Sequence, residues 1–322
     1  MLYQTEKSIA IAAVVAAAAL CEQVRSHRPP DAITKSDRSP VTIADFGAQA
    51  LICHAIAQAF PTDAIVAEEN ATLLRQPEMG DVLQQVTSVV QSQNPDATPD
   101  AVLDWIDRGT GSVSPRFWTL DPIDGTKGFL RGGQYAVALA LIEAGTVQLG
   151  VMACPALEVD GDRGVVFVAV RGQGTIRLHG GATKPLRVNQ SPSTGKSRVV
   201  ESVEASHGNR SRQHQIAEAL GLTDPPVQLD SLAKYGIVAQ GDAALYLRLP
   251  WSRTPDYREN IWDHAAGAIV VEEAGGRVSD MDGKPLEFSK SPKLLHNRGI
   301  VASNGSIHDA VLAAIQRTDS LD

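Results

Sequence analysis

Residues 134–155, Q-Y-A-V-A-L-A-L-I-E-A-G-T-V-Q-L-G-V-M-A-C-P, constrain the fold more than any other segment. Two apolar runs flank Ala144-Gly145, which is the pattern of a β-hairpin. The runs R-F-W-T-L-D before it and G-V-V-F-V-A-V-R-G-Q-G-T-I-R-L after it also predict strands. Helical patterns come earlier, notably F-G-A-Q-A-L-I-C-H-A-I-A-Q-A-F, which stops before Pro61. The sequence therefore predicts helices followed by antiparallel strands, with polar residues 71–104 as surface helices or a variable insertion.

From about residue 195 the pattern changes to alternating helices and strands. Strand-like S-R-V-V-E-S-V precedes a predicted helix around Ser211–Leu220, and the strand A-A-L-Y-L-R-L-P follows a further helical segment. The helix D-H-A-A-G-A-I-V-V-E-E-A ends at Gly275–Gly276, a C-terminal glycine stop. Such alternation is typical of an α/β layer. Because 322 residues suggest about two domains, we expect an α+β domain over residues 1–197 and a smaller α/β domain over 198–322.

Charge, cysteine content and the N-terminal run narrow the class of protein. The net charge of −8 argues against nucleic acid or an anionic membrane surface as the main partner. Three cysteines without metal-ligand spacing indicate a reduced, cytoplasmic protein. Residues 8–21, S-I-A-I-A-A-V-V-A-A-A-A-L-C, could be the core of a signal peptide, but Glu6 beside Lys7 leaves no basic n-region. The run is also shorter than a bilayer span, so we expect a first amphipathic helix.

Two aspartates three positions apart, Asp121 and Asp124, end the predicted strand W-T-L-D-P-I-D-G-T. Clusters of oxygen ligands without His or Cys favour hard cations, Mg²⁺ above all. Gly125 allows a tight turn, and Thr126 can begin a helix whose N–H groups would face an anion. A polar turn with an N-cap explains the same hexapeptide equally well.

Three further acids lie where a predicted strand or loop enters a helix. Glu68, with Glu69 beside it, follows a short apolar strand and could simply be solvated. Asp45 and Asp263 could each cap the helix that follows them. These interpretations are individually reasonable, but the joint arrangement of the acids favours a common site.

The motifs V-T-I-A-D, A-E-E, D-P-I-D-G-T and W-D-H-A-A-G, followed by E-A-G-G, occur in this order. Together they resemble the inositol monophosphatase superfamily of Mg²⁺-dependent, lithium-sensitive phosphatases. Within it, F-W-T-L-D-P-I-D-G-T-K-G-F-L-R-G-G-Q-Y and L-D-S-L-A-K-Y-G are similar to the 3'(2'),5'-bisphosphate nucleotidases. The resemblance covers about residues 3–305. It implies a sugar-phosphatase fold of α-β-α-β-α layers, with an antiparallel-sheet domain followed by a smaller α/β domain.

The resemblance also implies roles for individual residues. It makes two to three Mg²⁺ ions the cofactor, held by the carboxylates of Glu68, Asp121, Asp124 and Asp263 and the backbone oxygen of Ile123. It makes Asp45 and Thr126 the pair that orients and deprotonates the attacking water. Such a division is chemically sensible, because a bound metal lowers the pKa of water and phosphoryl transfer then needs chiefly positioning and charge neutralisation.

Residues of the second half suggest a substrate with a further phosphate. The resemblance places His207, Ser231, Lys234 and Arg248 around the 5'-phosphate and adenosine of a nucleotide, with Thr126 and Asp263 also touching the substrate. Ser231 and Lys234 share a face if both lie on a helix, and an arginine inside Y-L-R-L-P needs a partner. The alternatives are a solvated helix face for Lys234, an edge strand for Arg248 and a surface loop for His207. The neighbouring H-G-N-R departs from the serine- and histidine-rich family pattern at His207. His264 could support the metal site or simply pack in its helix.

We expect a cytoplasmic, monomeric enzyme acting on a small molecule. It would remove the 3'-phosphate of 3'-phosphoadenosine 5'-phosphate, giving AMP, and would also act on 3'-phosphoadenosine 5'-phosphosulfate. Lithium inhibition is expected. The alternatives are an inositol 1,4-bisphosphate or inositol monophosphate phosphatase and, in a different class, a catalytically silent nucleotide sensor.

Overall fold

A computed structural model describes residues 2–27, 32–35, 40–190, 198–204, 209–250, 254 and 256–319. The α-helices are α1 Gln4–His27, α2 Ile43–Ala59, α3 Gly80–Gln91, α4 Pro99–Asp107, α5 Thr126–Leu130, α6 Arg210–Ala219, α7 Ala233–Ala239, α8 Ala265–Glu273 and α9 His308–Asp319. The strands are β1 Ile33–Thr34, β2 Pro40–Val41, β3 Ala64–Ala67, β4 Arg116–Asp124, β5 Ala136–Glu143, β6 Thr146–Val159, β7 Asp162–Val170, β8 Gly174–His179, β9 Ala182–Leu186, β10 Val199–Glu201, β11 Val227–Gln228, β12 Leu245–Arg248, β13 Arg277–Ser279 and β14 Ile300–Ser303. A short 3₁₀ helix spans Pro77–Met79.

The larger sheet has seven strands in the order β3-β4-β5-β6-β7-β8-β9. β3 is parallel to β4, and every later neighbour is antiparallel. The hairpin predicted at Ala144-Gly145 is confirmed, and both turn residues have positive φ, 47° and 77°. This is the φ sign that a tight two-residue hairpin turn requires.

The smaller sheet has five strands in the order β11-β10-β12-β14-β13. β10 is parallel to both β11 and β12, while β14 is antiparallel to β12 and β13. The parallel pairs require crossover connections, and α6 and α7 lie in the chain between these strands. The predicted alternation of helix and strand in the second part is therefore confirmed.

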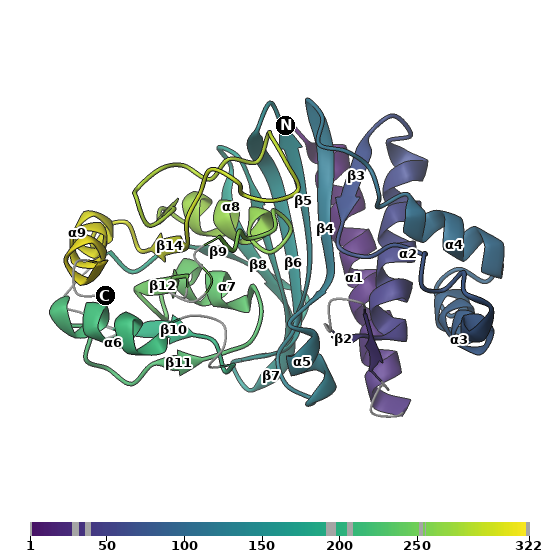
Figure 1. The fold of residues 1–322 in the computed structure, drawn as a ribbon, viewed down its shortest axis with the longest axis horizontal. Helices are drawn as coiled ribbons and strands as arrows, with labels where there is room; N and C mark the ends of the chain where they lie inside the picture. Colours follow the sequence, from purple (N-terminus) through teal and green to yellow (C-terminus); the bar gives the residue numbers. More distant parts are fainter. Residues whose placement is uncertain are drawn as a thin grey trace.

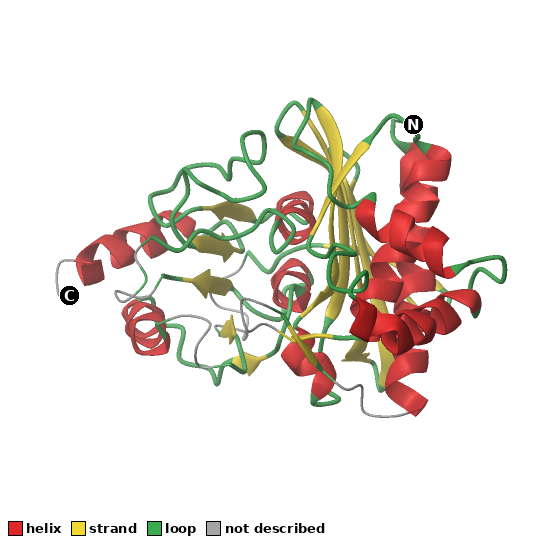
Figure 2. Ribbon diagram, turned by 45° about the vertical axis from the view of Figure 1, so that its right-hand side comes forward, coloured by secondary structure: helices red, strands yellow, loops and turns green. Residues whose placement is uncertain are grey.

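Three hydrophobic clusters show how the layers pack (Figures 1 and 2). The first joins α1 and α2 to one face of the larger sheet. The second joins its other face to α7, α8 and the smaller sheet, and the third joins the far face of the smaller sheet to α6 and α9. Alternate residues of β5 enter different clusters, Leu139 the first and Ala140 the second, as the two-residue period of a strand dictates. The predicted α-β-α-β-α layering is confirmed.

Helix α1 is longer than the apolar run that predicted it. By length and composition alone, Gln4–Ser26 is long and apolar enough to cross a membrane. Residues 8–21 were expected to be too short to span a bilayer, and this expectation does not hold for the whole helix. In the structure, however, Val14, Ala17 and Leu20 are completely buried within the first cluster. Packing against α2 and the larger sheet places α1 in the helical layer that covers one face of that sheet.

The two sheets are formed by consecutive parts of the chain. The larger sheet uses strands from residues 64–186 and the smaller one strands from 199–303. The predicted boundary at 197/198 falls between them, next to residues 191–197, which lie outside the described part, and it remains a proposal. Residues 71–104, predicted as surface helices or a variable insertion, contain α3 and the first part of α4, which pack on α2 through residues such as Val86 and Val102.

Candidate metal and phosphate site

Asp121 and Asp124, the two aspartates of the D-P-I-D-G-T motif, lie close together at the end of β4. The pairing of β4 with β5 is irregular between Asp121 and Asp124, so both side chains can turn toward the same place. Gly125 has φ +88°, a left-handed conformation that glycine adopts without strain, and Thr126 then begins α5. Asp121 is held by the Ile123 N–H at 3.1 Å, and Asp124 accepts a hydrogen bond from the Leu232 N–H.

A third aspartate joins these two from the other end of the chain. Carboxylate oxygens of Asp121, Asp124 and Asp263 all lie within 4.8 Å of one another. Asp263 precedes α8 but does not cap it, because the N-cap residue is His264 and makes no side-chain capping bond. Burial raises the pKa of all three carboxyls, that of Asp124 to about 6, and repulsion among the acids raises those of Asp121 and Asp263 further.

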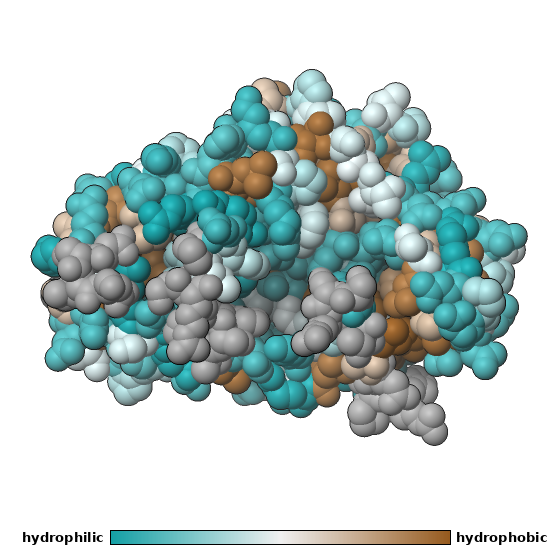
Figure 3. Space-filling model, in the orientation of Figure 1, coloured by the Kyte–Doolittle hydropathy of each residue, from teal (hydrophilic) through white to brown (hydrophobic). Residues whose placement is uncertain are grey.

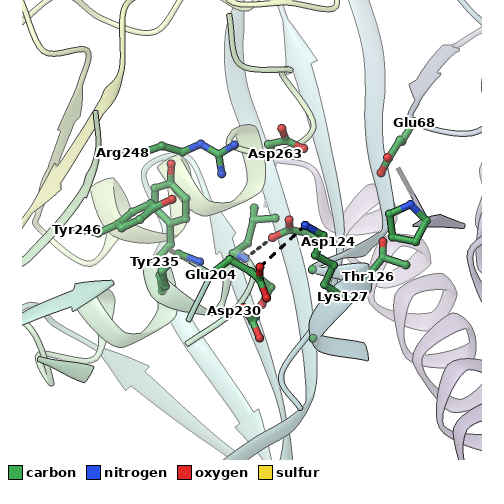
Figure 4. Close-up of a pocket in the computed structure, with 16 residues that line it drawn as sticks. Glu68, Asp124, Thr126, Lys127, Glu204, Asp230, Tyr235, Tyr246, Arg248 and Asp263 are labelled. Carbon is green, nitrogen blue, oxygen red and sulfur yellow. Dashed lines mark hydrogen bonds and ion pairs between the residues drawn. The ribbon is translucent and has the colours of Figure 1, made fainter. Parts of the chain in front are cut away.

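Glu68 faces the same space from the end of β3 (Figure 4). Lys35 Nζ lies 3.1 Å from Glu68 Oε1 and 2.7 Å from Glu69 Oε1. The solvated interpretation is wrong for Glu69, which is only 4% exposed. Burial, with Glu68 and Asp45 nearby, raises the pKa of Glu69 to about 8. We call Glu68, Asp121, Asp124 and Asp263 the acid end of the site.

Asp45 and Thr126, expected to act as a pair, have different hydrogen-bond partners in this structure. Asp45 Oδ2 accepts from the Thr42 N–H at 2.8 Å and from Thr42 Oγ1 at 2.6 Å, which closes a capping box in which Thr42 is the N-cap of α2. The Asp45 Oδ1 atom is buried, and it has no hydrogen-bond partner among the residues that the structure describes. Thr126 Oγ1 donates to the Ile123 carbonyl at 3.2 Å. Burial raises the pKa of Asp45 to about 7.

A cavity of about 360 Å³ connects the acid end to basic residues of the second half (Figure 4). In the space-filling view the face is hollowed near its centre, and hydrophilic side chains are seen in and above the hollow (Figure 3). The cavity is lined by Pro40, Glu68, Asp124, Gly125, Thr126, Lys127, Gly128, Glu204, Asp230, Ser231, Leu232, Lys234, Tyr235, Tyr246, Arg248 and Asp263. Acids and bases therefore face a shared space.

Lys234 lies on α7 and is only 4% exposed, so the solvated interpretation of this residue is wrong. Its Nζ donates to the Leu229 carbonyl at 3.3 Å and lies 5.4 Å from the centre of the Tyr246 ring. Burial lowers the pKa of Lys234 to about 8. Ser231 precedes α7 and has φ +70°, so the shared helix face expected for Ser231 and Lys234 is wrong, although both line the cavity. His207 lies outside the described residues.

Arg248 is on β12, which has neighbours on both sides, so the edge-strand interpretation is wrong. Its Nε donates to Glu259 Oε1 at 2.7 Å, and Glu259 Oε2 lies 3.3 Å from His264 Nε2. Tyr235 Oη and His264 Nδ1 are 2.8 Å apart. His264 is thus fully buried within a polar network that supports Arg248. We call Ser231, Lys234 and Arg248 the basic end of the site.

With this geometry in hand, comparison with known proteins decides the family. The model of the inositol monophosphatase family matches residues 3–320. The chain belongs to the inositol monophosphatase family. Proteins named 3'(2'),5'-bisphosphate nucleotidase from Emericella nidulans and Schizosaccharomyces pombe are each 41% identical to it; the alignments cover 98% and 100% of this chain and 99% and 98% of theirs. The expected resemblance to that group, and with it a phosphatase, is confirmed.

Solved structures agree with the family fold. The inositol monophosphatase of Thermotoga maritima is 25% identical with a TM-score of 0.67, over 99% of both chains. That of Anabaena is 23% identical with a TM-score of 0.64, over 98% of this chain and 97% of its own. These solved structures therefore share the overall fold of this chain.

The acid end of this family member suits a hard cation. Its donors are oxygens only, the carboxylates repel one another, and the unpartnered Asp45 Oδ1 lies buried near Glu68 and Glu69. Several contributors were not foreseen from the sequence, among them Lys35 beside the glutamates, Glu259 behind Arg248, and Glu204 at the cavity. Each depends on packing between distant segments, and nothing in its local sequence singles it out.

Proposed function

We propose that this enzyme hydrolyses the 3'-phosphate of 3'-phosphoadenosine 5'-phosphate to give AMP and phosphate. The observation that carries the proposal is the single cavity with the acid end on one side and the basic end on the other. One phosphate of a bisphosphate could lie at the acid end while the second lies near Lys234 and Arg248. The names of the relatives that are 41% identical support adenosine as the group between them.

We assign two to three Mg²⁺ ions to the acid end, held by Glu68, Asp121, Asp124, Asp263 and the Ile123 carbonyl. When bound there, Mg²⁺ would supply charge neutralisation for the phosphoryl group and make water more acidic. The carboxylates would hold that charge at the cavity, because hydrogen bonds from the Ile123 and Leu232 N–H groups fix the side chains of Asp121 and Asp124.

Proton transfer from the attacking water is assigned to Thr126 and Asp45. Thr126 lines the cavity, and its hydroxyl can accept a proton only if it gives its own to a base. Asp45 offers the free Oδ1 oxygen, and a pKa of about 7 suits a base that works near neutral pH. The hydroxyl would exchange its present bond with the Ile123 carbonyl for one with Asp45.

The basic end would bind the second phosphate and the nucleoside. Lys234 and Arg248 supply positive charge, Ser231 a hydroxyl, and His207 is assigned to the same region. The enzyme would also accept 3'-phosphoadenosine 5'-phosphosulfate, which links it to sulfur assimilation. We expect it to be inhibited by lithium and to act as a monomer in the cytoplasm.

A phosphate-release panel tests the proposal. Purified enzyme is assayed with Mg²⁺, with and without Li⁺, on 3'-phosphoadenosine 5'-phosphate, its phosphosulfate, inositol 1,4-bisphosphate and inositol 1-phosphate. The highest kcat/KM is expected on the adenosine bisphosphate. Preference for an inositol ester would refute the nucleotide assignment, and the absence of phosphate release from every ester would favour a silent nucleotide sensor.

A further inference from the structure

The cavity has a third wall besides the acid end and the basic end. It comprises Lys127, Gly128, Glu204 and Asp230, and we call these four residues the third wall. Helix α5 carries Lys127 and Gly128, Glu204 follows β10, and Asp230 precedes α7. Figure 4 shows the three labelled side chains of this wall together, below that of Asp263. Three separate segments of the chain therefore meet at one side of the cavity.

The charged side chains of the third wall are balanced by one another and by Arg131, the residue after α5. Arg131 donates to Glu204 Oε1 and, at 2.7 Å, to Asp230 Oδ2. The Nζ atom of Lys127 lies 3.9 Å from Glu204 Oε2. Arg131 is not among the described residues that line the cavity, so it neutralises the two acids from outside. Because the bases offset the acids, a phosphate gains little from this wall.

Glu204 is the hydrogen-bond acceptor that this wall presents to the cavity. A carboxylate only accepts hydrogen bonds, and it has about four lone-pair sites on its two oxygens. Its Oε1 atom receives Arg131, and the 3.9 Å between Oε2 and Lys127 Nζ is longer than a hydrogen bond. The Glu204 side chain is 23% exposed, whereas that of Asp230 is 8% exposed. Glu204 can therefore accept a further N–H or O–H from a molecule in the cavity while it stays paired with Arg131.

An adenosine bisphosphate has two charged phosphates and an uncharged base to place in the cavity. The phosphates are assigned to the acid end and the basic end, which leaves the charge-balanced wall for the base. We propose that the third wall binds the adenine base and that Glu204 accepts a hydrogen bond from its exocyclic amino group. This inference deepens the proposed function and rests on it. Glu204 therefore selects the base, because hypoxanthine has a carbonyl oxygen at that position and two facing acceptors form no hydrogen bond.

The test measures base selectivity as the ratio of kcat/KM on adenosine 3',5'-bisphosphate to kcat/KM on inosine 3',5'-bisphosphate. The wild type should prefer the adenosine ester roughly 10- to 100-fold, the range for a hydrogen bond to a charged group. In Glu204→Gln the preference should shrink to about threefold or less, because an amide can accept from an amino group or donate to a carbonyl. Glu218→Gln, the same charge change at an exposed position of α6, is the matched control and should keep the full preference.

Two further comparisons separate recognition of the base from other roles of Glu204. Glu204→Asp keeps the charge but shortens the side chain, so the preference should fall in this variant too, since a hydrogen bond depends steeply on distance. The 2'-deoxy form of adenosine 3',5'-bisphosphate lacks the ribose hydroxyl but keeps the base, so Glu204→Gln should lower kcat/KM on both forms by the same factor. An effect that disappeared on the deoxy ester would place the carboxylate at the ribose and overturn the proposal.

The remaining outcomes distinguish this inference from the proposed function. Equal losses on the adenosine and inosine esters in Glu204→Gln would identify a purely structural ion pair and overturn the proposal. A wild type that hydrolysed both esters equally well would also overturn it, yet would leave the proposed function intact. A wild type that preferred an inositol ester would refute the proposed function and this inference together.

Discussion

The two ends of the cavity handle buried charge in opposite ways. Within the described part of the chain, no ion pair joins Asp121, Asp124 or Asp263 to a base, although their oxygens lie within 4.8 Å of one another. At the basic end, Arg248 is bound by Glu259 at 2.7 Å, and Lys234 rests on a carbonyl and an aromatic ring. The three aspartates of the acid end therefore lack a direct ion-pair partner, while the basic end is held by the protein itself.

This difference shows what stabilises the buried charges at each end of the cavity. Clustered, poorly hydrated carboxylates favour protonation or a bound cation, because Lys234 and Arg248 offset the repulsion at Asp124 and Asp263 only in part. A buried arginine with its own carboxylate is already positioned for an anion and needs no such addition. We expect substitutions at the acid end to abolish the chemistry and substitutions at the basic end to weaken binding.

The largest effect should come from Asp124→Asn. The neutral amide keeps the shape but removes a charge from the acid end, so kcat should fall by more than the roughly 10–100-fold that loss of an outer partner of a metal ligand causes. Phosphate release under saturating substrate and Mg²⁺ measures this. Asp96→Asn, on an exposed turn, controls for the charge change. Near-native kcat in Asp124→Asn would end the assignment of this residue to the metal.

At the basic end, Lys234→Met should mainly impair binding. A lost charged hydrogen bond would raise KM for the adenosine bisphosphate about tenfold to hundredfold, and KM for adenosine 3'-monophosphate much less. Lys184→Met, on exposed β9, is the matched control. Equal losses on the two esters would place the second phosphate elsewhere.

A smaller effect is expected from Glu259→Gln, which tests whether the basic end is pre-arranged. Arg248 would keep a hydrogen-bond acceptor but lose its charged partner, so KM for the bisphosphate should rise roughly threefold to tenfold and the melting temperature should fall. Kinetics and thermal denaturation of Glu259→Gln are compared with the exposed control Glu78→Gln. An unchanged KM would mean that Arg248 needs no support from Glu259.

The smallest effect is a pH dependence of stability in metal-free protein. Asp45 and Asp124 have pKa values of about 7 and 6 in the folded state, above the ordinary value for aspartate. Their raised pKa values stabilise the fold at low pH, and this stabilisation is lost as pH rises through 6 and 7. In EDTA, the melting temperature should therefore fall by a few degrees between pH 5 and pH 8, at ~2 °C per kcal/mol.

Added Mg²⁺ should restore most of that loss at pH 8, because a cation offsets the ionised carboxylates. Asp45→Asn should flatten the pH profile in EDTA, since the amide does not titrate. A melting temperature that rose with pH in EDTA would show that ionisation of these carboxyl groups does not destabilise the fold.

Local patterns predicted most of the fold and the acid end. The hairpin at Ala144-Gly145 and the transition from β4 through Gly125 into α5 depend on residues adjacent in the chain, so turn chemistry and periodicity suffice. Family resemblance then connected acids that lie far apart in sequence. Neither the local patterns nor the family resemblance predicted which residues surround each side chain.

What could not be predicted depends on packing between segments. Glu69 is buried where Gln49 binds its backbone and Lys35 pairs with its carboxylate, and Arg248 pairs with Glu259, 11 residues further along the chain. Ser231 looked helical by spacing, yet the turn into α7 gives it a positive φ. In each case the deciding interaction is tertiary, and it overrides the local preference.

The contact between α7 and α8 has a consequence for the evolution of substrate size. A Cβ atom at Gly267 would lie 2.2 Å from Tyr235, so the two helices touch without space for a side chain there. Lys234 adjoins Tyr235 on α7, and Asp263 closely precedes α8. The close approach of the two helices therefore helps to set the distance between Lys234 at the basic end and Asp263 at the acid end. We expect enzymes that accept longer or shorter bisphosphates to differ in the residues that set this interhelical distance, as well as in those that line the cavity.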